Sequence, residues 1–355
     1  MTAEAIDRQK VRAFAGRLVD LYAGGMLGLM INIGDECGLF AAMATDAGTS
    51  AAIAERAGLD ERYVREWLGA MTCAGIVSYD SDLELYSLPP EHAMCLAGET
   101  IYNLAPRSSG LAYLPKVLPG IKEAFRRGGG VPYAAYRPEF TAMQDSGDRI
   151  RYRELLVKRY LPLAPGLVEG LAGGLRVADA GCGTGLCVNL MARAFPASTF
   201  VGYDISEEAI DRARQESATT GATNASYEVL DVRQIPTELP FDLITAFDAI
   251  HDQVDPAGVL RRIHDALAPD GMFFMFDIKL SSSLADNVGG TWAAYLYSVS
   301  VMHCLSVSLA EGGAGLGTMW GHQLAKQMLA DAGFGRVELL DVPGDPANGA
   351  YLCQK

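Results

Sequence analysis

The chain has 355 residues, half of them hydrophobic, and its 29 lysines and arginines are outnumbered by 43 aspartates and glutamates. The formal charge of −14 argues against a nucleic acid partner, because affinity for nucleic acid comes largely from basic side chains on phosphates. No uninterrupted apolar run approaches the roughly 18 residues of a membrane span, and the amino terminus lacks a secretory apolar segment, so we expect a cytoplasmic chain without a membrane partner.

Two helices are predicted at the amino terminus, over residues 6–22 and 26–43, with a break at Gly24–Gly25. The second helix is apolar around nearly its whole circumference. A helix with such a surface is buried, either in a core or against a partner. We therefore expect residues 1–95 to hold a helical and winged-helix dimerisation domain, and the chain to form a homodimer.

Residues 48–90 follow the order helix, turn, helix, hairpin that is typical of a winged helix. Thr49 caps a short helix, Gly58 forms the turn, and Asp60 caps a second helix. Two functions are compatible with this pattern: DNA recognition, or a dimerisation module that covers the substrate. Acidic and basic residues nearly cancel over the second helix, which favours the dimerisation module over entry into a phosphate-lined groove.

A helical connector or lid is expected over residues 96–165. Three glycines at 128–130 form a flexible break within it. The aromatic-bearing loop 132–136 that follows either covers a pocket or packs as an ordinary loop. A basic helix over residues 149–160 then leads into the next domain.

Strands alternate with helices over residues 166–355, which is the pattern of a doubly wound, mostly parallel sheet. The predicted fold class is α/β, with a seven-stranded Rossmann-like sheet behind the winged-helix domain. An insertion over residues 281–318, rich in Ser, Gly and aromatic residues, is expected to form a lid. The predicted strands cover residues 176–180, 199–204, 225–230, 241–247, 272–277, 337–340 and 350–353, and a turn is expected at 269–271.

A glycine turn between the first two of these strands is the strongest functional signal. The first strand ends near Asp179 and is followed by Gly181, Gly183 and Gly185, and the second strand ends at Asp204. Glycines let the backbone turn sharply and approach a ligand where a Cβ would clash. At the carboxyl edge of a parallel sheet, this arrangement predicts a site for an adenosine-containing cofactor.

The spacing D-x-G-x-G-x-G resembles the first motif of class I S-adenosylmethionine (SAM) methyltransferases. The resemblance implies that the glycine turn touches the amino-acid end of SAM and that Asp204 holds the ribose. It also implies that Asp231, after the third strand, binds the adenine amine, and that the Val232 amide meets a ring nitrogen. Ile205 and Phe247 complete the expected cofactor contacts, and the product is S-adenosylhomocysteine (SAH).

The segment after the fourth strand resembles that of plant-type small-molecule O-methyltransferases, which carry a His-Asp pair there. The resemblance implies that His251 is the general base for a substrate hydroxyl and that Asp277 orients it. An imidazole near neutral pH suits this task, although a helix-cap role for His251 stays open. The chain departs from the family twice: Asp277 replaces a Glu, and the family's Trp near the pair has no counterpart, with Gln253 following instead.

The insertion supplies candidate substrate contacts. Trp292, Tyr295 and Met302 either line an apolar substrate cavity or pack within the lid. The seven cysteines show no CxxC pairing and the histidines show no metal-ligand spacing. We therefore expect reduced thiols and no metal.

Residues 58–69, followed later by the SAM motif, resemble a bacterial group of winged-helix SAM methyltransferases that is typified in mycobacteria. This resemblance implies SAM binding and a homodimer formed through the amino-terminal region. The leading hypothesis is methyl transfer to a hydroxyl of a small, partly apolar metabolite. The alternatives are an N- or C-methyltransferase of the same fold, and a winged-helix regulator that senses SAM.

Overall fold

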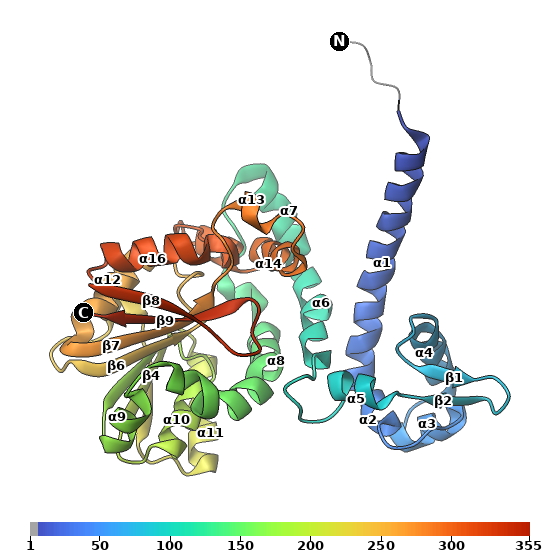
Figure 1. Cartoon of the computed structure of the whole chain (residues 1–355), viewed down its shortest axis with the longest axis horizontal. Coiled ribbons are helices and arrows are strands. Elements are labelled where there is room, and N and C mark those ends of the chain that lie inside the picture. Colours follow the sequence, from blue (N-terminus) through green and yellow to red (C-terminus); the bar gives the residue numbers. More distant parts are fainter. Residues whose placement is uncertain (1–5) are drawn as a thin grey trace. The chain divides into compact units, whose positions relative to one another are not determined.

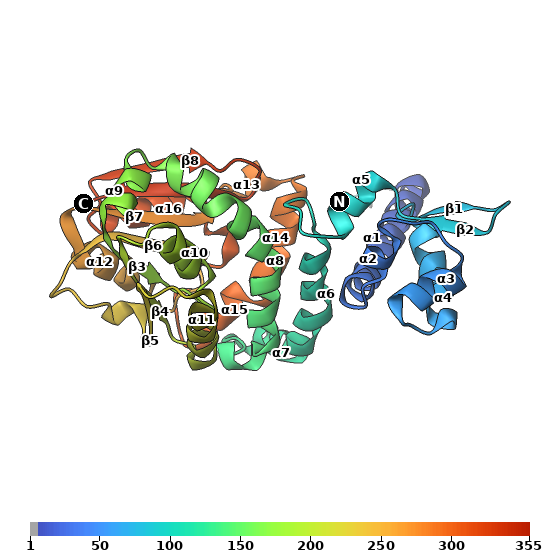
Figure 2. The ribbon, with the colours of Figure 1, turned by 90° about the horizontal axis from the view of Figure 1, so that it is seen from below.

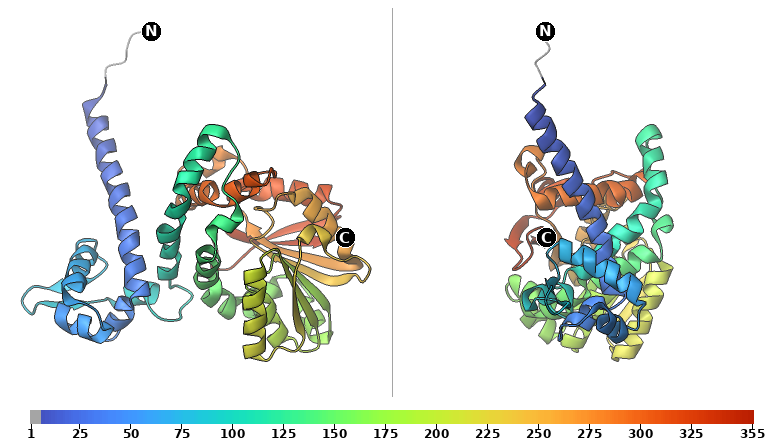
Figure 3. Two further views of the ribbon diagram at one scale, coloured as in Figure 1. Left: turned by 180° about the vertical axis from the view of Figure 1, so that it is seen from behind. Right: turned by 90° about the vertical axis from the view of Figure 1, so that its right-hand side faces the viewer.

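The computed structural model describes residues 6–355, and the chain divides into two compact units between Pro115 and Lys116 (Figure 1). The first unit holds the winged helix, and the second holds the large sheet. The predicted connector, residues 96–165, is thus divided between the two units. Figures 2 and 3 show the same elements from other sides.

The first unit begins with one long helix, α1 (Arg8–Glu36). The predicted break at Gly24–Gly25 is wrong, because the helix runs through both glycines. Each glycine lowers helix stability by roughly 1 kcal/mol relative to alanine. The helix nevertheless continues, because adding residues to an existing helix is much easier than starting a new one. Of the residues of α1 only Gly28, Asn32 and Gly34 are buried, so most of its apolar surface is uncovered within this unit.

The winged helix forms as predicted, with α3 (Ser50–Ala57) and α4 (Glu61–Cys73). Side chains of Thr49 and Asp60 accept hydrogen bonds from the backbone amides of the first turns, and Gly58 ends α3 with a φ of 66°. The other elements of this unit are the helices α2 (Leu39–Met43), α5 (Pro90–Leu96) and α6 (Ser109–Tyr113), and the wing strands β1 (Ser78–Asp80) and β2 (Leu85–Ser87).

A single tryptophan ties the winged helix to α1. The Trp67 Nε1 donates a hydrogen bond of 2.8 Å to the carbonyl oxygen of Met30. The indole ring also packs edge-on against Phe40, with ring centroids 5.3 Å apart. The carboxyl-terminal half of α1 is therefore part of the core of this unit, while its amino-terminal half extends beyond it (Figure 1).

The second unit is built on a seven-stranded sheet in the order β5-β4-β3-β6-β7-β9-β8. The first five strands in this order are parallel, and β9 runs antiparallel to both of its neighbours. The predicted doubly wound sheet and its closing antiparallel hairpin are confirmed. The strands are β3 (Arg176–Ala180), β4 (Thr199–Asp204), β5 (Ala225–Val229), β6 (Phe241–Phe247), β7 (Leu267–Ile278), β8 (Arg336–Asp341) and β9 (Asn348–Gln354).

Helices cover both faces of this sheet, because successive residues of each central strand face opposite hydrophobic cores. In β6, Leu243 belongs to the core under α10 and Ile244 to the core under α12 and α16. The helices of this unit are α7 (Leu118–Arg127), α8 (Glu139–Leu155), α9 (Leu167–Gly173), α10 (Leu186–Ala194), α11 (Glu207–Thr220), α12 (Pro256–Ala266), α13 (Leu284–Asn287), α14 (Thr291–Met302), α15 (Cys304–Ala310) and α16 (Gly321–Asp331).

The turn predicted at residues 269–271 is wrong, because these residues lie inside β7. Leu267 already pairs with Phe241 of β6, and the register between the two strands shifts before Leu243. The proline and glycine of the segment are therefore absorbed by an irregularity in the strand, which is where such residues are tolerated in a sheet.

Two stretches are long and apolar enough to cross a membrane by length and composition alone. They are α1, with a mean hydropathy of 1.3, and residues 291–310, with a mean hydropathy of 1.4. The second stretch is two helices, since the backbone leaves helical geometry at His303 with φ −141° and ψ −82°. Core helices of ordinary globular domains meet the same criterion. Counting uninterrupted apolar residues does not find these two stretches, whereas mean hydropathy tolerates a few polar residues within a segment.

Candidate cofactor and active site

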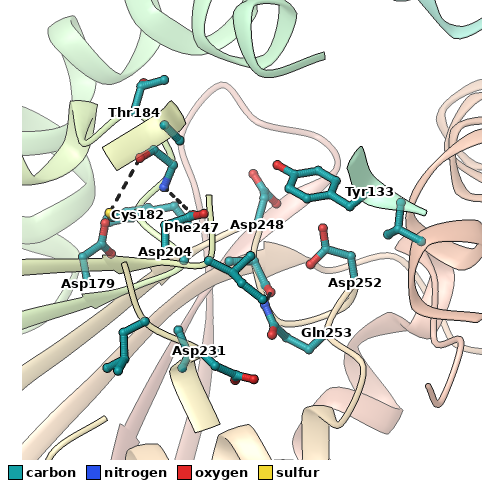
Figure 4. A pocket seen from close by; sticks show the side chains of 18 of the residues that line it. Tyr133, Asp179, Cys182, Thr184, Asp204, Asp231, Phe247, Asp248, Asp252 and Gln253 are labelled. Carbon is teal, nitrogen blue, oxygen red and sulfur yellow. Dashed lines mark hydrogen bonds between the residues drawn. The ribbon is translucent and has the colours of Figure 1, made fainter. Parts of the chain in front are cut away.

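A cavity of about 720 Å³ lies at the carboxyl edge of the sheet, beside the ends of β3, β4 and β6 (Figure 4). Ligands of open α/β sheets bind at this edge. Eight of the predicted cofactor residues line the cavity, and the ninth, Gly185, does not. The eight are Asp179, Gly181, Gly183, Asp204, Ile205, Asp231, Val232 and Phe247.

The glycine turn uses the left-handed backbone conformation at all three glycines, and two of them also lack room for a Cβ. Gly181, Gly183 and Gly185 have φ angles of 79°, 52° and 74°, which L side chains rarely adopt. A Cβ at Gly181 would lie 2.6 Å from the Cβ of Ala249, and one at Gly185 would lie 2.6 Å from the Cβ of Ala213. Gly185 therefore shapes the start of α10 behind the cavity, while the first two glycines form the cavity wall.

Asp204 fixes the glycine turn to the end of β4. Its Oδ2 accepts a hydrogen bond from the Gly183 amide at 2.9 Å (Figure 4), and its Oδ1 accepts one from the Ser206 amide at 2.8 Å. Burial raises the pKa of this carboxyl, and the two amide hydrogen bonds oppose the rise. Each oxygen keeps a lone pair that can accept a ribose hydroxyl.

Asp231 lies at another part of the cavity wall and is already paired. The Arg233 side chain donates from Nε to its Oδ2 at 2.9 Å, and the Arg233 guanidinium also approaches through Nη2. These hydrogen bonds lower the pKa of Asp231, so the carboxylate is charged at neutral pH. The ion pair fixes the side chain beside Val232, the residue expected to meet the adenine ring.

Asp179 lies at the base of the cavity and is 2% exposed. It accepts a hydrogen bond of 2.6 Å from the Thr245 hydroxyl on the neighbouring strand. Burial raises the pKa of Asp179 to about 7, so this carboxyl is a hydrogen-bond donor in part of the population at neutral pH.

The expected dyad of His251 and Asp277 is present. The His251 Nδ1 lies 2.8 Å from Asp277 Oδ1, and the same oxygen accepts hydrogen bonds from the Trp320 indole at 3.1 Å and the Ile278 amide at 2.7 Å. The shorter reach of Asp compared with Glu is therefore sufficient. His251 is 4% exposed and is not among the residues that line the cavity.

The charge state of this dyad bears on its chemistry. Burial by itself disfavours a charged imidazole, but the charge of Asp277 and its hydrogen bond outweigh burial and raise the pKa of His251 well above its usual value. A raised pKa favours the imidazolium form, which is a poorer proton acceptor than the neutral ring.

The next residue, Asp252, does line the cavity. Burial raises the pKa of Asp252 to about 6, and the nearby charge of His251 limits the rise. Tyr133 and Asp248 lie beside Asp252 around one space in Figure 4. Asp248 reaches this place through a left-handed backbone conformation with φ 50°, which Asp tolerates better than most residues.

The aromatic loop after the three glycines covers the cavity rather than packing as an ordinary loop. Pro132, Tyr133, Ala134 and Arg137 all line the cavity. The loop is held against the insertion, because the Tyr136 hydroxyl donates a hydrogen bond of 2.7 Å to the carbonyl oxygen of Met302.

The predicted substrate residues lie elsewhere. Trp292 and Tyr295 of α14 are 39% and 43% exposed and pack against each other, with ring centroids 6.1 Å apart. Neither they nor Met302 line the cavity. The insertion instead reaches the cavity through α15 and the turn after it, by Val307 and Glu311.

The cavity wall also includes residues to which sequence reasoning gave no role, among them Arg137, Tyr152, Asp248, Asp252 and Gln253. Three of these lie in the same segment as His251, where the resemblance to a His-Asp motif gave the role of base to the histidine. Nothing local in the sequence marks the other two, which fold over the sheet from the preceding helical region. Among the side chains that the structure describes, no three His, Cys, Asp or Glu residues are grouped as metal ligands would be.

Comparison with known protein families finds one match in the winged-helix region and one in the region of the large sheet. Residues 25–98 match the family described as Rv2258c-like winged HTH domain, and residues 171–333 match the family described as Methyltransferase domain. Among curated proteins, the Ubiquinone biosynthesis O-methyltransferase of Neisseria meningitidis serogroup C (strain 053442) is 33% identical over 123 residues, which are 33% of this chain and 51% of that protein. The chain thus spans about half the length of the curated relatives that it matches.

Two solved structures resemble the whole chain. One, from Nostoc punctiforme PCC 73102 and provisionally described as an O-methyltransferase, has a TM-score of 0.75 at 18% identity, covering 97% of this chain and 98% of that one. The other, human N-acetylserotonin methyltransferase in complex with SAM, has a TM-score of 0.69 at 17% identity, covering 100% and 99%. At these identities the likeness shows a shared fold.

Proposed function

We propose that this chain, which joins a winged-helix domain to a class I SAM-dependent methyltransferase domain, transfers the methyl group of SAM to a hydroxyl of a small, partly apolar metabolite. One observation carries the proposal: a cavity at the carboxyl edge of the sheet is walled by the glycine turn and by a series of acids that follow successive strands. The matched families and the O-methyltransferase relative support it.

The cofactor residues divide by the part of SAM that each would hold. Asp204 would accept the ribose hydroxyls, Asp231 the adenine amine, and the Val232 amide would donate to a ring nitrogen. Gly181 and Gly183 let the backbone approach the amino-acid part. Ile205 and Phe247 flank the adenosine, Asp179 supports the turn from below, and Gly185 shapes it from behind. No metal is needed in this scheme, because the sulfonium is itself an activated leaving group.

In the proposed reaction, the acceptor oxygen attacks the methyl carbon of SAM. The carbon–sulfur bond breaks, its electron pair stays on sulfur, and SAH forms. The hydroxyl proton must leave the oxygen as the new bond forms, so a base within hydrogen-bond reach is required. The cavity supplies the alignment that such an in-line displacement depends on.

We propose that Asp252 receives this proton and that the His251–Asp277 dyad holds Asp252 ionised. Asp252 lines the cavity, whereas His251 does not, and the charge of Asp277 raises the pKa of His251 well above its usual value. The imidazolium favours the ionised form of its neighbour, which keeps a buried carboxylate available near neutral pH. This arrangement differs from the expected histidine base and assigns the histidine an electrostatic role.

A hydroxyl acceptor fits these groups better than an amine. A neutral amine can attack SAM without a base, so the cavity would not need an ionised carboxylate for it. The apolar part of the acceptor would meet Val254 and Val307, and Tyr133 covers the same space. We propose the cytoplasm as the place of action, in keeping with seven cysteines that form no disulfide.

We also propose a homodimer formed through the first unit. The supporting observation is the uncovered apolar surface of α1, where Phe14, Val19 and Tyr22 are 60%, 64% and 69% exposed. A monomer rarely leaves so many large apolar side chains together in water.

Regulation of transcription is the second candidate function, and the matched winged-helix family is the observation that favours it. The charges of α4 speak against it, because Arg62 is paired with Glu66, and Arg65 with Glu61. These acids offset the positive charge that a phosphate contact would use. DNA binding whose affinity falls by several decades between low and physiological salt would favour the regulator.

The test of the proposed function has two parts. Calorimetry should show SAH and SAM binding to the purified chain. Tritium should then pass from methyl-labelled SAM to members of a panel of phenols, flavonoids, catechols and amines, with the hydroxylated members labelled and the amines unlabelled. Failure to bind either nucleoside would contradict the proposal, and labelling of amines alone would move it to an N-methyltransferase.

A further inference from the structure

The cavity wall is rich in acids and poor in cations. Its described lining residues include the carboxyl groups of Asp179, Asp204, Asp231, Asp248, Asp252 and Glu311, and the guanidinium groups of Arg137 and Arg233. SAM carries two positive groups, the sulfonium and the ammonium, and one negative group, the carboxylate of its amino-acid part. The acids of the cavity can balance the two positive groups of this ligand. Its carboxylate requires a positively charged side chain.

Only one of the two arginines can meet that demand. Arg233 is engaged in a two-point ion pair with Asp231. Arg137 forms no ion pair within the described part of the chain, and its Nε is buried without a hydrogen-bond partner there. Its guanidinium is stacked over the ring of Tyr133, 4.1 Å from the centroid. Stacking on an aromatic face leaves the edge of the guanidinium, with its N–H groups, open to an anion.

Arg137 lines the same cavity as Gly181 and Gly183, the residues proposed to meet the amino-acid part of the cofactor. Burial raises the pKa of Asp204, and the Arg137 charge opposes part of that rise, whereas the pKa of Asp231 is lowered by its hydrogen bond from Arg233. Arg137 therefore acts on the residue proposed for the ribose and not on the residue proposed for the adenine. Tyr133, which it stacks on, lies beside Asp252, where the methyl group must be transferred (Figure 4).

The segment that carries Arg137 is held in place before any ligand binds. The Val131 amide donates to the Ser306 hydroxyl at 2.8 Å, and the Tyr136 hydroxyl donates to the carbonyl oxygen of Met302 at 2.7 Å. A Cβ at Gly130 would lie 1.9 Å from the Ser306 carbonyl oxygen, so the loop lies directly on α15. A cation on a fixed loop binds an anion without a further cost of ordering that loop.

From these observations we infer that Arg137 binds the carboxylate of the amino-acid part of SAM and SAH, through its guanidinium edge. The inference rests on the proposed function, since it assumes that SAM is the ligand. It assigns to the loop over the cavity a direct part in cofactor recognition.

The test compares two ligands that differ only in the carboxylate. Wild type, Arg137→Met and Arg137→Lys are titrated by calorimetry with SAH and with decarboxylated SAH, S-adenosyl-3-thiopropylamine. We expect Arg137→Met to bind SAH roughly 10- to 100-fold more weakly, the usual effect of losing a charge-assisted hydrogen-bonded pair, and to bind the decarboxylated ligand as wild type does. Arg137→Lys should bind SAH with intermediate affinity, because it keeps the charge and loses the two-point geometry.

Arg233→Gln is the matched arginine control. It should weaken both ligands by the same factor, since both carry the adenosine. Binding of the decarboxylated ligand by Arg137→Met also shows that this variant is folded. The inference is overturned if Arg137→Met leaves SAH affinity unchanged, or if it weakens both ligands equally. If wild type binds neither ligand, the proposed function itself fails. That result can be told apart from the two outcomes that overturn only the role of Arg137.

Discussion

At the scale of single residues, Asp204 joins the glycine turn to the end of β4. Its two oxygens accept the amides of Gly183 and Ser206, and the residue lines the cavity. Removing the charge therefore weakens the turn and the ribose contact together.

We predict that Asp204→Asn binds SAH at least about 10-fold more weakly than wild type, because hydrogen bonds to a charged group contribute roughly 1.5–3 kcal/mol. Calorimetry measures the effect. Asp211→Asn, on the exposed face of α11, is the control and should bind SAH as wild type does. Equal affinity of Asp204→Asn and wild type would contradict the ribose assignment.

The pH dependence of turnover tests the proton acceptor. With the pKa of Asp252 raised to about 6, the carboxylate is protonated below that pH and ionised above it. Turnover on a hydroxylated acceptor should therefore rise as the pH increases through about 6. A neutral histidine base would give the same direction, so the variants decide between them.

Asp252→Asn should lower turnover by roughly 10²- to 10⁴-fold at all pH values, the usual contribution of a general base, with SAH affinity retained. His251→Ala should keep measurable turnover but move the acid limb of the profile to higher pH, because the cation that favours ionised Asp252 is gone. Full activity of Asp252→Asn, with none for His251→Ala, would return the role of base to the histidine.

At the scale of elements, two features decide how the cavity is closed. One is α15, whose residue Ser306 holds the loop that precedes Arg137. The other is the backbone at Gly130, which approaches α15 closely enough to exclude any side chain.

We predict that Gly130→Ala lowers the melting temperature by several degrees, because overpacking costs about 1–3 kcal/mol, and that it also weakens SAH binding by displacing the loop. Thermal unfolding followed by calorimetric titration measures both effects. Gly173→Ala is the matched control, since no atom lies within 4 Å of its added Cβ. An unchanged melting temperature for Gly130→Ala would show that the loop can move away at little cost.

At the scale of the whole molecule, the apolar surface of α1 determines the expected assembly. Its hydrophobic residues Phe14, Val19 and Tyr22 are exposed within the first unit. A monomer in water rarely exposes a large apolar surface, because contact between apolar side chains and water is unfavourable.

A double variant, Phe14→Asp with Tyr22→Asp, should convert the homodimer to a monomer, because it places charges in a surface that association would bury. Light scattering of wild type and variant gives the two masses. Tyr63→Asp on α4, at a tyrosine even more exposed than Tyr22, is the control and should leave the assembly unchanged. A monomeric wild type would remove the basis of the proposal.

The sequence alone determined the sheet, the winged helix and the motif at the cofactor edge. These features depend on local regularities: strands that alternate with helices, caps such as Thr49 and Asp60, and glycines at Gly181 and Gly183 whose left-handed backbone favours glycine. Two local predictions, the break at Gly24–Gly25 and the turn at residues 269–271, were wrong because hydrogen bonding along a long helix and across a sheet outweighed the preferences of a few residues.

Only the tertiary structure decided which side chains meet in the cavity. Arg137 lies 42 positions before Asp179 in the chain, and nothing between them predicts that a loop folds back over the sheet edge. His251 and Asp252 are neighbours in sequence, yet one side chain is buried against Asp277 and the other lines the cavity. Trp292 and Tyr295, chosen for their chemistry, do not line the cavity. Burial and charge pairing of a side chain depend on segments that are distant in the sequence. Local sequence patterns therefore do not predict them.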